Sequence, residues 1–259
     1  CYSGYGRGNG SPGDVAYHVL RINPEDGSIA WHRKLAPRRP VQQWKGWTAS
    51  HGFASPSPVV TEEAVYVFFS NTGVFALDHN GKGLWHRDVG RNVHAWGSGA
   101  SPVVYKDLLI VNASVESKTL FGLNRKTGEI VWKQSGINDS WVTPVIMNAD
   151  GRDELVISQK GSIHAFEPMT GKPLWHTPAM REYVVPSPVA HGGVVYCLGR
   201  REAFAVKGGG SGNVKDTHIL WHHRGGATTP SPALYDGHLY WLDDAGVAYC
   251  VNIKTGERV

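Results

Sequence analysis

The chain has little cysteine and no long apolar stretch, and each absence argues against a class of protein. Its 259 residues include three cysteines, Cys1, Cys197 and Cys250. None stands in a Cys-x-x-Cys pair, so neither a zinc site nor a thiol redox motif is indicated. No apolar run approaches the roughly 18 residues of a membrane-spanning helix, and no signal peptide is visible. We therefore expect no membrane span, and a lipid anchor at Cys1 only if Cys1 is a true mature N-terminus.

A strong excess of charge is also missing. Lys and Arg total 26 against 22 for Asp and Glu, a difference of 26 − 22 = 4. The basic residues are scattered apart from the loop His32–Arg39, so we expect no nucleic-acid partner. No Gly-x-Ser-x-Gly elbow occurs, and the 13 histidines form no His-x-His or His-Glu-x-x-His spacing. No catalytic residue and no histidine metal site are therefore predicted.

Glycine and tryptophan are abundant, with 32 and 10 copies, and this composition favours short strands joined by tight turns. Two sequence markers repeat along the chain, and both have nearly the same period. Prolines that follow Ser or Thr and begin an apolar stretch are spaced by 44, 42, 44 and 44 residues, and tryptophans that end an apolar run by 54, 47, 43 and 46. The prolines are Pro58, Pro102, Pro144, Pro188 and Pro232, and the tryptophans are Trp31, Trp85, Trp132, Trp175 and Trp221.

Each tryptophan ends a hairpin element such as GLNRKTGEIVW, residues 122–132. Asn124 begins the turn by accepting backbone hydrogen bonds, and Gly128 takes the positive φ that other residues resist. Trp132 then supplies a large flat surface for packing between neighbouring sheets. A period of about 40–45 residues with four strands is typical of a propeller blade. We therefore expect the five tryptophans to dock one blade on the next.

This element resembles the tryptophan-docking motif of the PQQ-like (quinoprotein-like) propeller repeats. That superfamily includes quinoprotein alcohol dehydrogenases, the propeller lipoprotein of the outer-membrane β-barrel assembly machine, and many bacterial PQQ-like repeat proteins. The resemblance implies an all-β chain, a β-propeller of four-stranded antiparallel blades with about six repeats present. We expect a single domain over residues 1–259, truncated at both ends and belonging to a seven- or eight-bladed ring. The alternative is a compact six-bladed ring that begins at a lipidated Cys1.

The loops that lead into the first strand of each blade are the candidate ligand-binding segments. Such loops converge near the axis of a propeller, and aromatic side chains beside a few polar groups suit a flat ring or a sugar. The competing interpretation is that the same side chains fill the narrow axis. The candidate residues are Trp47, His51, His94, Trp96, Asp139, Trp141, Arg181 and Tyr183.

A weaker candidate site lies in NADGRDE, residues 148–154, which resembles the calcium loop of integrin-type propellers. Asn148, Asp150 and Glu154 match ligand positions, but Ile146 occupies the first acidic one, which weakens a calcium site. An Asp-Gly hairpin explains the same residues. The Gly-rich stretch Gly208–Asp216 is likewise expected to be an extended hairpin loop, because no Gly-Lys-Ser/Thr and no helix follow it.

The leading functional hypothesis is a non-catalytic scaffold in an exported, periplasmic bacterial protein, with a protein partner or a small ligand bound at the axial loops or a blade edge. The alternatives are a PQQ-dependent alcohol or sugar dehydrogenase and a sensor domain of a larger protein. A quinoprotein dehydrogenase requires a carboxylate base, a calcium ion and, in the families it resembles, a vicinal disulfide. The sequence has no Cys-Cys pair and one acid, Asp139, in the candidate loops, so PQQ and calcium are disfavoured.

Overall fold

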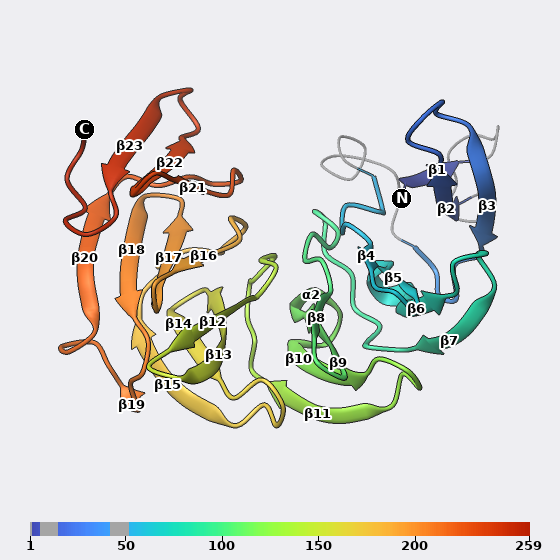
Figure 1. Ribbon diagram of the computed structural model, residues 1–259, viewed down its shortest axis with the longest axis horizontal. Helices are drawn as coiled ribbons and strands as arrows, with labels where there is room; N and C mark the ends of the chain where they lie inside the picture. The colour runs from blue at the N-terminus through green and yellow to red at the C-terminus, as the bar shows by residue number, and fades with distance from the viewer. Residues whose placement is uncertain (1, 6–14, 42–51) are drawn as a thin grey trace. The chain divides into compact units, whose positions relative to one another are not determined.

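A computed structural model describes residues 2–5, 15–41 and 52–259, and it is built almost entirely of β-strands (Figure 1). The chain forms two compact units, Cys1–Val131 and Trp132–Val259. The prediction of one domain truncated at both ends stays a prediction. Within the described ranges, no helix is long and apolar enough to cross a membrane.

The first unit contains a series of antiparallel sheets whose strands follow one another in chain order. The sheet that β11 closes carries the chain from the first unit into the second. The sheets are β1 (Tyr2–Tyr5), β2 (Val15–Ile22) and β3 (Ile29–Leu35); β4 (Val59–Val60), β5 (Val65–Phe68), β6 (Val74–Leu77) and β7 (Gly83–Arg87); and β8 (Val103–Tyr105), β9 (Leu108–Ala113), β10 (Thr119–Asn124) and β11 (Ile130–Ser135).

The second unit repeats the same meander. Its sheets are β12 (Val145–Ala149), β13 (Arg152–Gln159), β14 (Ser162–Phe166) and β15 (Pro173–Pro178), joined by β19 (Gly212–Asn213); β16 (Val189–His191), β17 (Val194–Gly199), β18 (Glu202–Lys207) and β20 (Ile219–Arg224); and β21 (Ala233–Tyr235), β22 (His238–Leu242) and β23 (Ala248–Asn252). Six such sheets lie in the described residues, and each is a propeller blade. The predicted fold, a β-propeller of antiparallel blades, is confirmed, and the blade number of an intact ring stays a prediction.

The stretch Gly208–Asp216 differs from the simple hairpin loop that the sequence suggests. Its residues Gly212 and Asn213 form β19, which pairs in parallel with Trp175 and His176 of β15. The amide of Val214 also donates to the carbonyl of His176 at 2.9 Å. The insertion therefore adds a fifth strand to the outer edge of the preceding blade.

The middle strands of each blade carry the core because both of their faces are covered. Every residue of β9 is buried, as is every residue of β5 and β6. In the first unit one cluster joins these strands to β10 through Phe68, Leu109 and Phe121. A central strand packed on both faces reads as a continuous apolar run rather than an alternating one, which explains why Val65–Phe68 shows no period of two.

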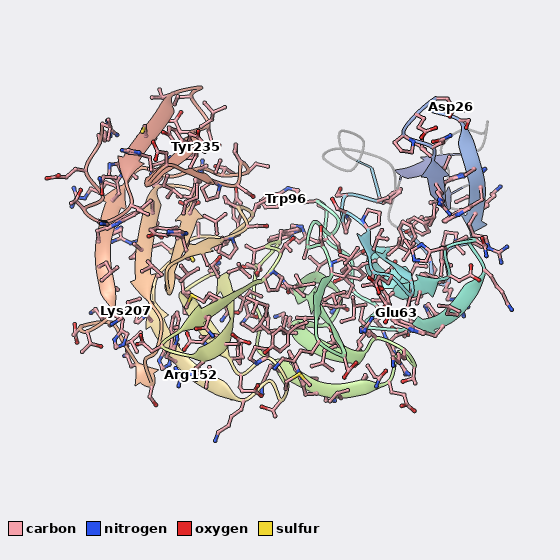
Figure 2. The ribbon with its side chains drawn as sticks, viewed as in Figure 1. Asp26, Glu63, Trp96, Arg152, Lys207 and Tyr235 are labelled. Carbon is pink, nitrogen blue, oxygen red and sulfur yellow. The ribbon has the colours of Figure 1, made fainter. Side chains whose placement is uncertain are left out.

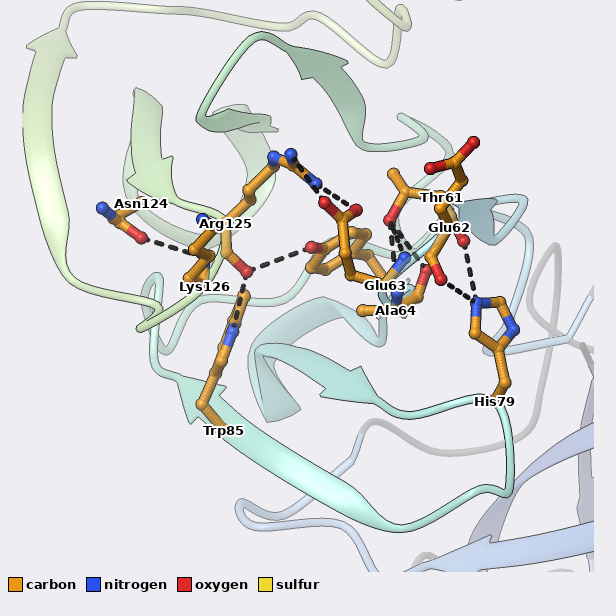
Figure 3. A network of polar contacts seen from close by, with 10 residues as sticks. Thr61, Glu62, Glu63, Ala64, His79, Trp85, Asn124, Arg125 and Lys126 are labelled. Atoms are coloured by element: carbon orange, nitrogen blue, oxygen red, sulfur yellow. Dashed lines mark hydrogen bonds and ion pairs between the residues drawn. The ribbon is translucent and has the colours of Figure 1, made fainter.

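Trp85 shows how a tryptophan at the end of a blade contacts the next blade (Figure 3). Its Nε1 donates to the carbonyl of Arg125 at 3.0 Å, and that carbonyl also accepts the Tyr66 hydroxyl at 3.1 Å. Gly128, at φ +71°, lies so close to the indole that a Cβ there would stand 2.5 Å from the ring. Only glycine allows this approach, so the sequence needs both the tryptophan and the glycine.

Three further tryptophans follow the same arrangement. Each donates to a carbonyl in a turn of the following blade, and the glycine of that turn lies against its indole ring. The pairs are Trp31 with His79 and Gly81, Trp132 with Pro168 and Gly171, and Trp221 with Ile253 and Gly256. The fifth, Trp175, donates instead to the Glu154 carboxylate at 2.7 Å.

The repeated Ser/Thr-Pro pairs have a structural role that their spacing explains. The amide of Ser57 donates to the Ser101 hydroxyl at 2.9 Å, and that of Thr143 to the Ser187 hydroxyl at 2.9 Å. The amide of Ser187 donates in turn to the Ser231 hydroxyl at 3.0 Å. Each bond joins residues 44 positions apart, so one serine per repeat connects the starts of successive blades.

Candidate ligand-binding face

In each blade the lead-in loop, which precedes the first strand, lies at the same end as the turn between the second and third strands, because the strands are antiparallel. A polar side chain of that turn holds the lead-in loop of its own blade. Gln159 Oε1 accepts the amide of Asn138 at 2.8 Å, and Glu202 Oε1 accepts the amide of Arg181 at 2.6 Å. Asp244 Oδ1 accepts the amide of Thr228 at 3.2 Å. Hydrogen bonds to these turn side chains therefore hold the lead-in loops in place, and the oxygen atoms that make them already accept a backbone amide.

Glu116, in the short helix α2 (Ser114–Ser117), plays a related part in the first unit. Its side chain is buried, and its carboxylate accepts the hydroxyls of Ser70, at 3.0 Å, and Ser98. Its backbone carbonyl accepts the amide of Asn92 at 3.1 Å. Burial raises the Glu116 pKa to about 7, against which the two hydroxyls act weakly. The loop 92–102 thus rests on a carboxyl group that titrates near neutrality.

The candidates in the second unit partly come together. The amide of Trp141 donates to the carbonyl of Val184, the amide of Val184 donates to the carbonyl of Asp139, and Ser140 forms a bridge with Val184. These bonds place the Tyr183 ring 6.3 Å from the buried Trp141 indole, edge to face at 81°. The Trp141 indole therefore serves packing between two lead-in loops, and Tyr183 covers it.

Asp139 and Arg181 are the exposed, charged candidates of these two loops. Asp139 has φ +46° and pairs with Lys160 at 3.4 Å. Arg181 lines the cleft described below. The loops thus present one paired acid and one arginine whose side chain forms no ion pair with any described residue.

In the first unit His94 and Trp96 form a pair of their own. The amide of Gly97 donates to the carbonyl of His94 at 2.8 Å, closing a tight turn, and the two rings meet edge to face at 5.2 Å. His94 is exposed, and Trp96, which Figure 2 labels, is half-buried. Trp47 and His51 lie outside the described residues.

A cleft of about 700 Å³ opens in the second unit between the blade of β16–β20 and that of β21–β23. Its walls come from the lead-in loop at Arg181, the β17–β18 turn, the end of β20 and the β22–β23 turn. The lining residues are Met180, Arg181, Glu182, Gly199, Arg200, Arg201, Glu202, His222, Arg224, Gly225, Gly226, Asp243, Asp244 and Ala245.

The calcium candidates do not form a common ligand set. Glu154 is fully buried, and its carboxylate accepts Trp175 Nε1, the guanidinium of Arg152 at 2.5 Å and the amide of Gly209 at 3.0 Å. Asn148 bonds instead to Asp153 and to the amide of Gly151. The oxygen atoms of Glu154 and Asn148 that could bind a metal therefore accept hydrogen bonds from the protein instead, and this set does not fit calcium. Among the described residues, no three side chains of His, Cys, Asp or Glu gather as a metal ligand set.

The described cleft also does not fit a quinone. A flat aromatic cofactor needs apolar faces, yet the lining holds no Trp, Phe or Tyr. Its acids are already bonded within the protein, as Asp244 and Glu202 show. No catalytic step through PQQ is therefore derived from these residues.

The sequence alone does not point to the turn acceptors Glu116, Gln159, Glu202 and Asp244, nor to Arg201 and Arg224. The sequences of these turns are SVESK, SQKGS, GRRE and DDAG, and the residue that accepts the hydrogen bond does not occupy the same position in all of them. Their one sequence signal is a polar residue between two apolar strands, and such a residue is ordinary in any hairpin.

Fold and site together define a β-propeller of PQQ-like repeats. A family model described as "Outer membrane protein assembly factor BamB" matches residues 119–259, which is 141 of 259 residues. The chain therefore belongs to this BamB family. A search of curated proteins found no match.

Solved structures show the same fold. BamB from Moraxella catarrhalis superposes with a TM-score of 0.63 at 18% identity, covering 90% of this chain and 66% of that one. The quinohemoprotein alcohol dehydrogenase ADHIIG from Pseudomonas putida HK5 gives 0.54 at 16% identity, covering 79% of this chain and 41% of that one. The chain thus spans less than two thirds of either structure, and at these identities the likeness concerns the fold alone.

Proposed function

We propose that the chain is a non-catalytic scaffold of an exported bacterial protein, which binds a protein partner through its lead-in loops. The observation that carries the proposal is that these loops are held by the turn acceptors of their own blades. A rigid loop presents its side chains at little cost in conformational entropy, which favours recognition. Membership of a family described as an outer-membrane protein assembly factor supports a partner in that assembly machinery and a location outside the cytoplasm.

The engaged acids support the scaffold over the dehydrogenase. A general base must be within reach of a substrate proton, whereas Glu116 accepts two hydroxyls and Glu202 accepts a backbone amide. The likeness to the dehydrogenase carries no argument for the same chemistry, because many functions share one fold.

The test is direct binding to a purified outer-membrane protein assembly machinery from which its own BamB has been removed. The immobilised chain is expected to retain the machinery, and the Asp139→Lys/Tyr183→Ala variant to retain less. A variant changed at Lys254 and Thr255, in the turn that follows β23 and outside the lead-in loops, serves as the matched control. Equal retention by all three chains contradicts a role for the lead-in loops.

A second arm addresses the enzyme alternative. The folded chain, checked by circular dichroism, is titrated with PQQ and calcium and then assayed for dye reduction with simple alcohols and sugars. The scaffold proposal expects no saturable binding. Saturable binding with substrate-dependent dye reduction contradicts it.

A further inference from the structure

The four acids that line the cleft of the second unit are already bonded within the protein. Asp243 accepts the amides of Ala245 and Val247, both at 2.9 Å, and the Tyr249 hydroxyl at 3.1 Å. Asp244 accepts the amide and the hydroxyl of Thr228. The amide bonds lower the pKa of Asp243, so it stays ionised and acts as an acceptor for the turn. These two acids shape the wall rather than face a ligand.

The two glutamates of the lining are engaged as well. Glu182 pairs with Arg200 at 3.0 Å, which raises the pKa of that guanidinium. Glu202 accepts the amide of Arg181 at 2.6 Å and lies 3.8 Å from His222. All four carboxylates of the cleft therefore have partners.

The arginines are in the opposite situation. The lining carries four arginines against four acids, so its formal charges cancel. Of the arginines only Arg200 forms an ion pair. The exposed side chains of Arg181, Arg201 and Arg224 form no ion pair or hydrogen bond with any described residue. The hydrogen-bond donors left without an acceptor among the described residues of the cleft are thus three guanidiniums, contributed by three separate segments.

Guanidinium groups present forked donors that match carboxylates and phosphates. The remaining lining consists of three glycines, His222, Met180 and Ala245, so the cleft lacks the apolar walls that bury a small organic ligand. An open, glycine-lined cleft instead admits a polypeptide whose own backbone supplies part of the contact.

We propose that this cleft binds an acidic segment of a protein partner, whose Asp or Glu carboxylates pair with Arg181, Arg201 and Arg224. The inference rests on the proposed scaffold function and names the chemistry that the partner presents. It assigns to the β17–β18 turn and the end of β20 a recognition role in addition to that of the lead-in loops.

The test uses the purified chain and a short fluorescein-labelled peptide of alternating glutamate and glycine, read by fluorescence anisotropy. The matched peptide of glutamine and glycine reports binding that does not need charge. We expect the glutamate peptide to bind, the glutamine peptide to bind far more weakly, and added salt to reduce the difference. Arg181→Gln/Arg201→Gln/Arg224→Gln is expected to weaken glutamate-peptide binding about tenfold.

The control variant is Arg33→Gln/Lys215→Gln/Lys254→Gln, which removes the same charge from exposed positions outside the cleft and is expected to bind as the native chain does. A lysine version of the three cleft positions keeps the charge and verifies that the fold tolerates substitution there. Equal binding of both peptides, or an equal loss in the two glutamine variants, overturns the proposal. If the cleft variant still retains the assembly machinery while the glutamate peptide fails to bind, the proposal that the cleft binds an acidic segment is wrong and the proposed scaffold function stands.

Discussion

Four of the docking tryptophans donate to a backbone carbonyl of the next blade, whereas Trp175 donates to the carboxylate of Glu154 in its own blade. The difference arises where Gly208–Asp216 replaces the usual turn. At Trp85 the turn supplies both the acceptor, Arg125, and the glycine that lies against the ring. A buried side chain can therefore accept the indole N–H of a docking tryptophan in place of the turn carbonyl.

The substitute brings requirements that a carbonyl does not have. A buried carboxylate must be paired and fully hydrogen-bonded to be tolerated. Glu154 meets this through Arg152 and the amide of Gly209, and Arg152 also donates to the carbonyl of Gly210 at 2.8 Å. The insertion thus supplies the Gly209 amide that donates to the Glu154 carboxylate and the Gly210 carbonyl that accepts from Arg152.

The largest effect is expected from Glu154→Leu. The change leaves Trp175 Nε1 and the amide of Gly209 without an acceptor, and Arg152 loses its ion-pair partner. The unsatisfied indole N–H and the lost hydrogen bonds to a charged group together cost about 3–5 kcal/mol in the free energy of unfolding. Urea denaturation measures it. Glu63→Leu removes an exposed partner of Arg125 and is expected to cost far less, because solvent screens an exposed ion pair. Similar costs for the two variants contradict the distinction between the junctions.

Glu116 provides a buried carboxyl without an arginine partner, and its effect depends on pH. Burial raises its pKa from the ordinary 4.5 of a glutamate to about 7 in the folded chain, so the folded state binds more protons between these values. Stability is therefore greatest below pH 4.5, falls as pH rises to about 7, and is constant above that as far as this group is concerned. The fall is about 3 kcal/mol.

Glu116→Gln is expected to remove this fall, because a neutral amide can keep the bonds with Ser70 and Ser98. Unfolding free energies measured from pH 5 to pH 8 test it. Ser98→Ala is the control, since it removes one hydroxyl but retains the titrating group. An unchanged slope in the glutamine variant excludes Glu116 as its source.

The repeat, the docking elements and the strands follow from the sequence because they depend on residues close together in the chain. A glycine followed four residues later by a tryptophan, as at Gly128 and Trp132, marks the same turn in each repeat that contains it. The sequence could not predict that Trp175 would bond to Glu154, because these residues meet through two different hairpins. The same holds for Arg181, Arg201 and Arg224, which are brought into one cleft only when two blades pack.

Gly128→Ala tests how tightly the regular junction is packed. Gly128 and Gly27 have nearly the same backbone, φ +71° and φ +72°, but nothing lies within 4 Å of a Cβ at Gly27. Both changes carry the cost of a left-handed alanine, about 1 kcal/mol, and Gly128→Ala also forces the Trp85 ring to move. We expect Gly128→Ala to cost about 1–3 kcal/mol more in urea unfolding. Equal costs indicate that the indole can shift freely.

The smallest difference is expected between Trp175→Phe and Trp85→Phe. Both lose an indole hydrogen bond, but the carbonyl of Arg125 still accepts the Tyr66 hydroxyl, whereas Glu154 Oε2 is left without its donor. Trp175→Phe should therefore cost about 1 kcal/mol more than Trp85→Phe. Thermal melts of the two variants side by side measure the difference, and the reverse order refutes the ranking.

The serines that connect successive blades have a consequence for how the chain comes apart. Ser187 both accepts from Thr143 and donates to Ser231, so it belongs to two neighbouring repeats at once. Loosening one blade leaves a polar group of its neighbour without a partner, which lowers the neighbour's own stability. We therefore expect the repeats that these bonds join to unfold as a nearest-neighbour array, in which the stability of each repeat depends on that of the next. The loss of one such bond is then expected to shorten the stretch of chain that unfolds cooperatively.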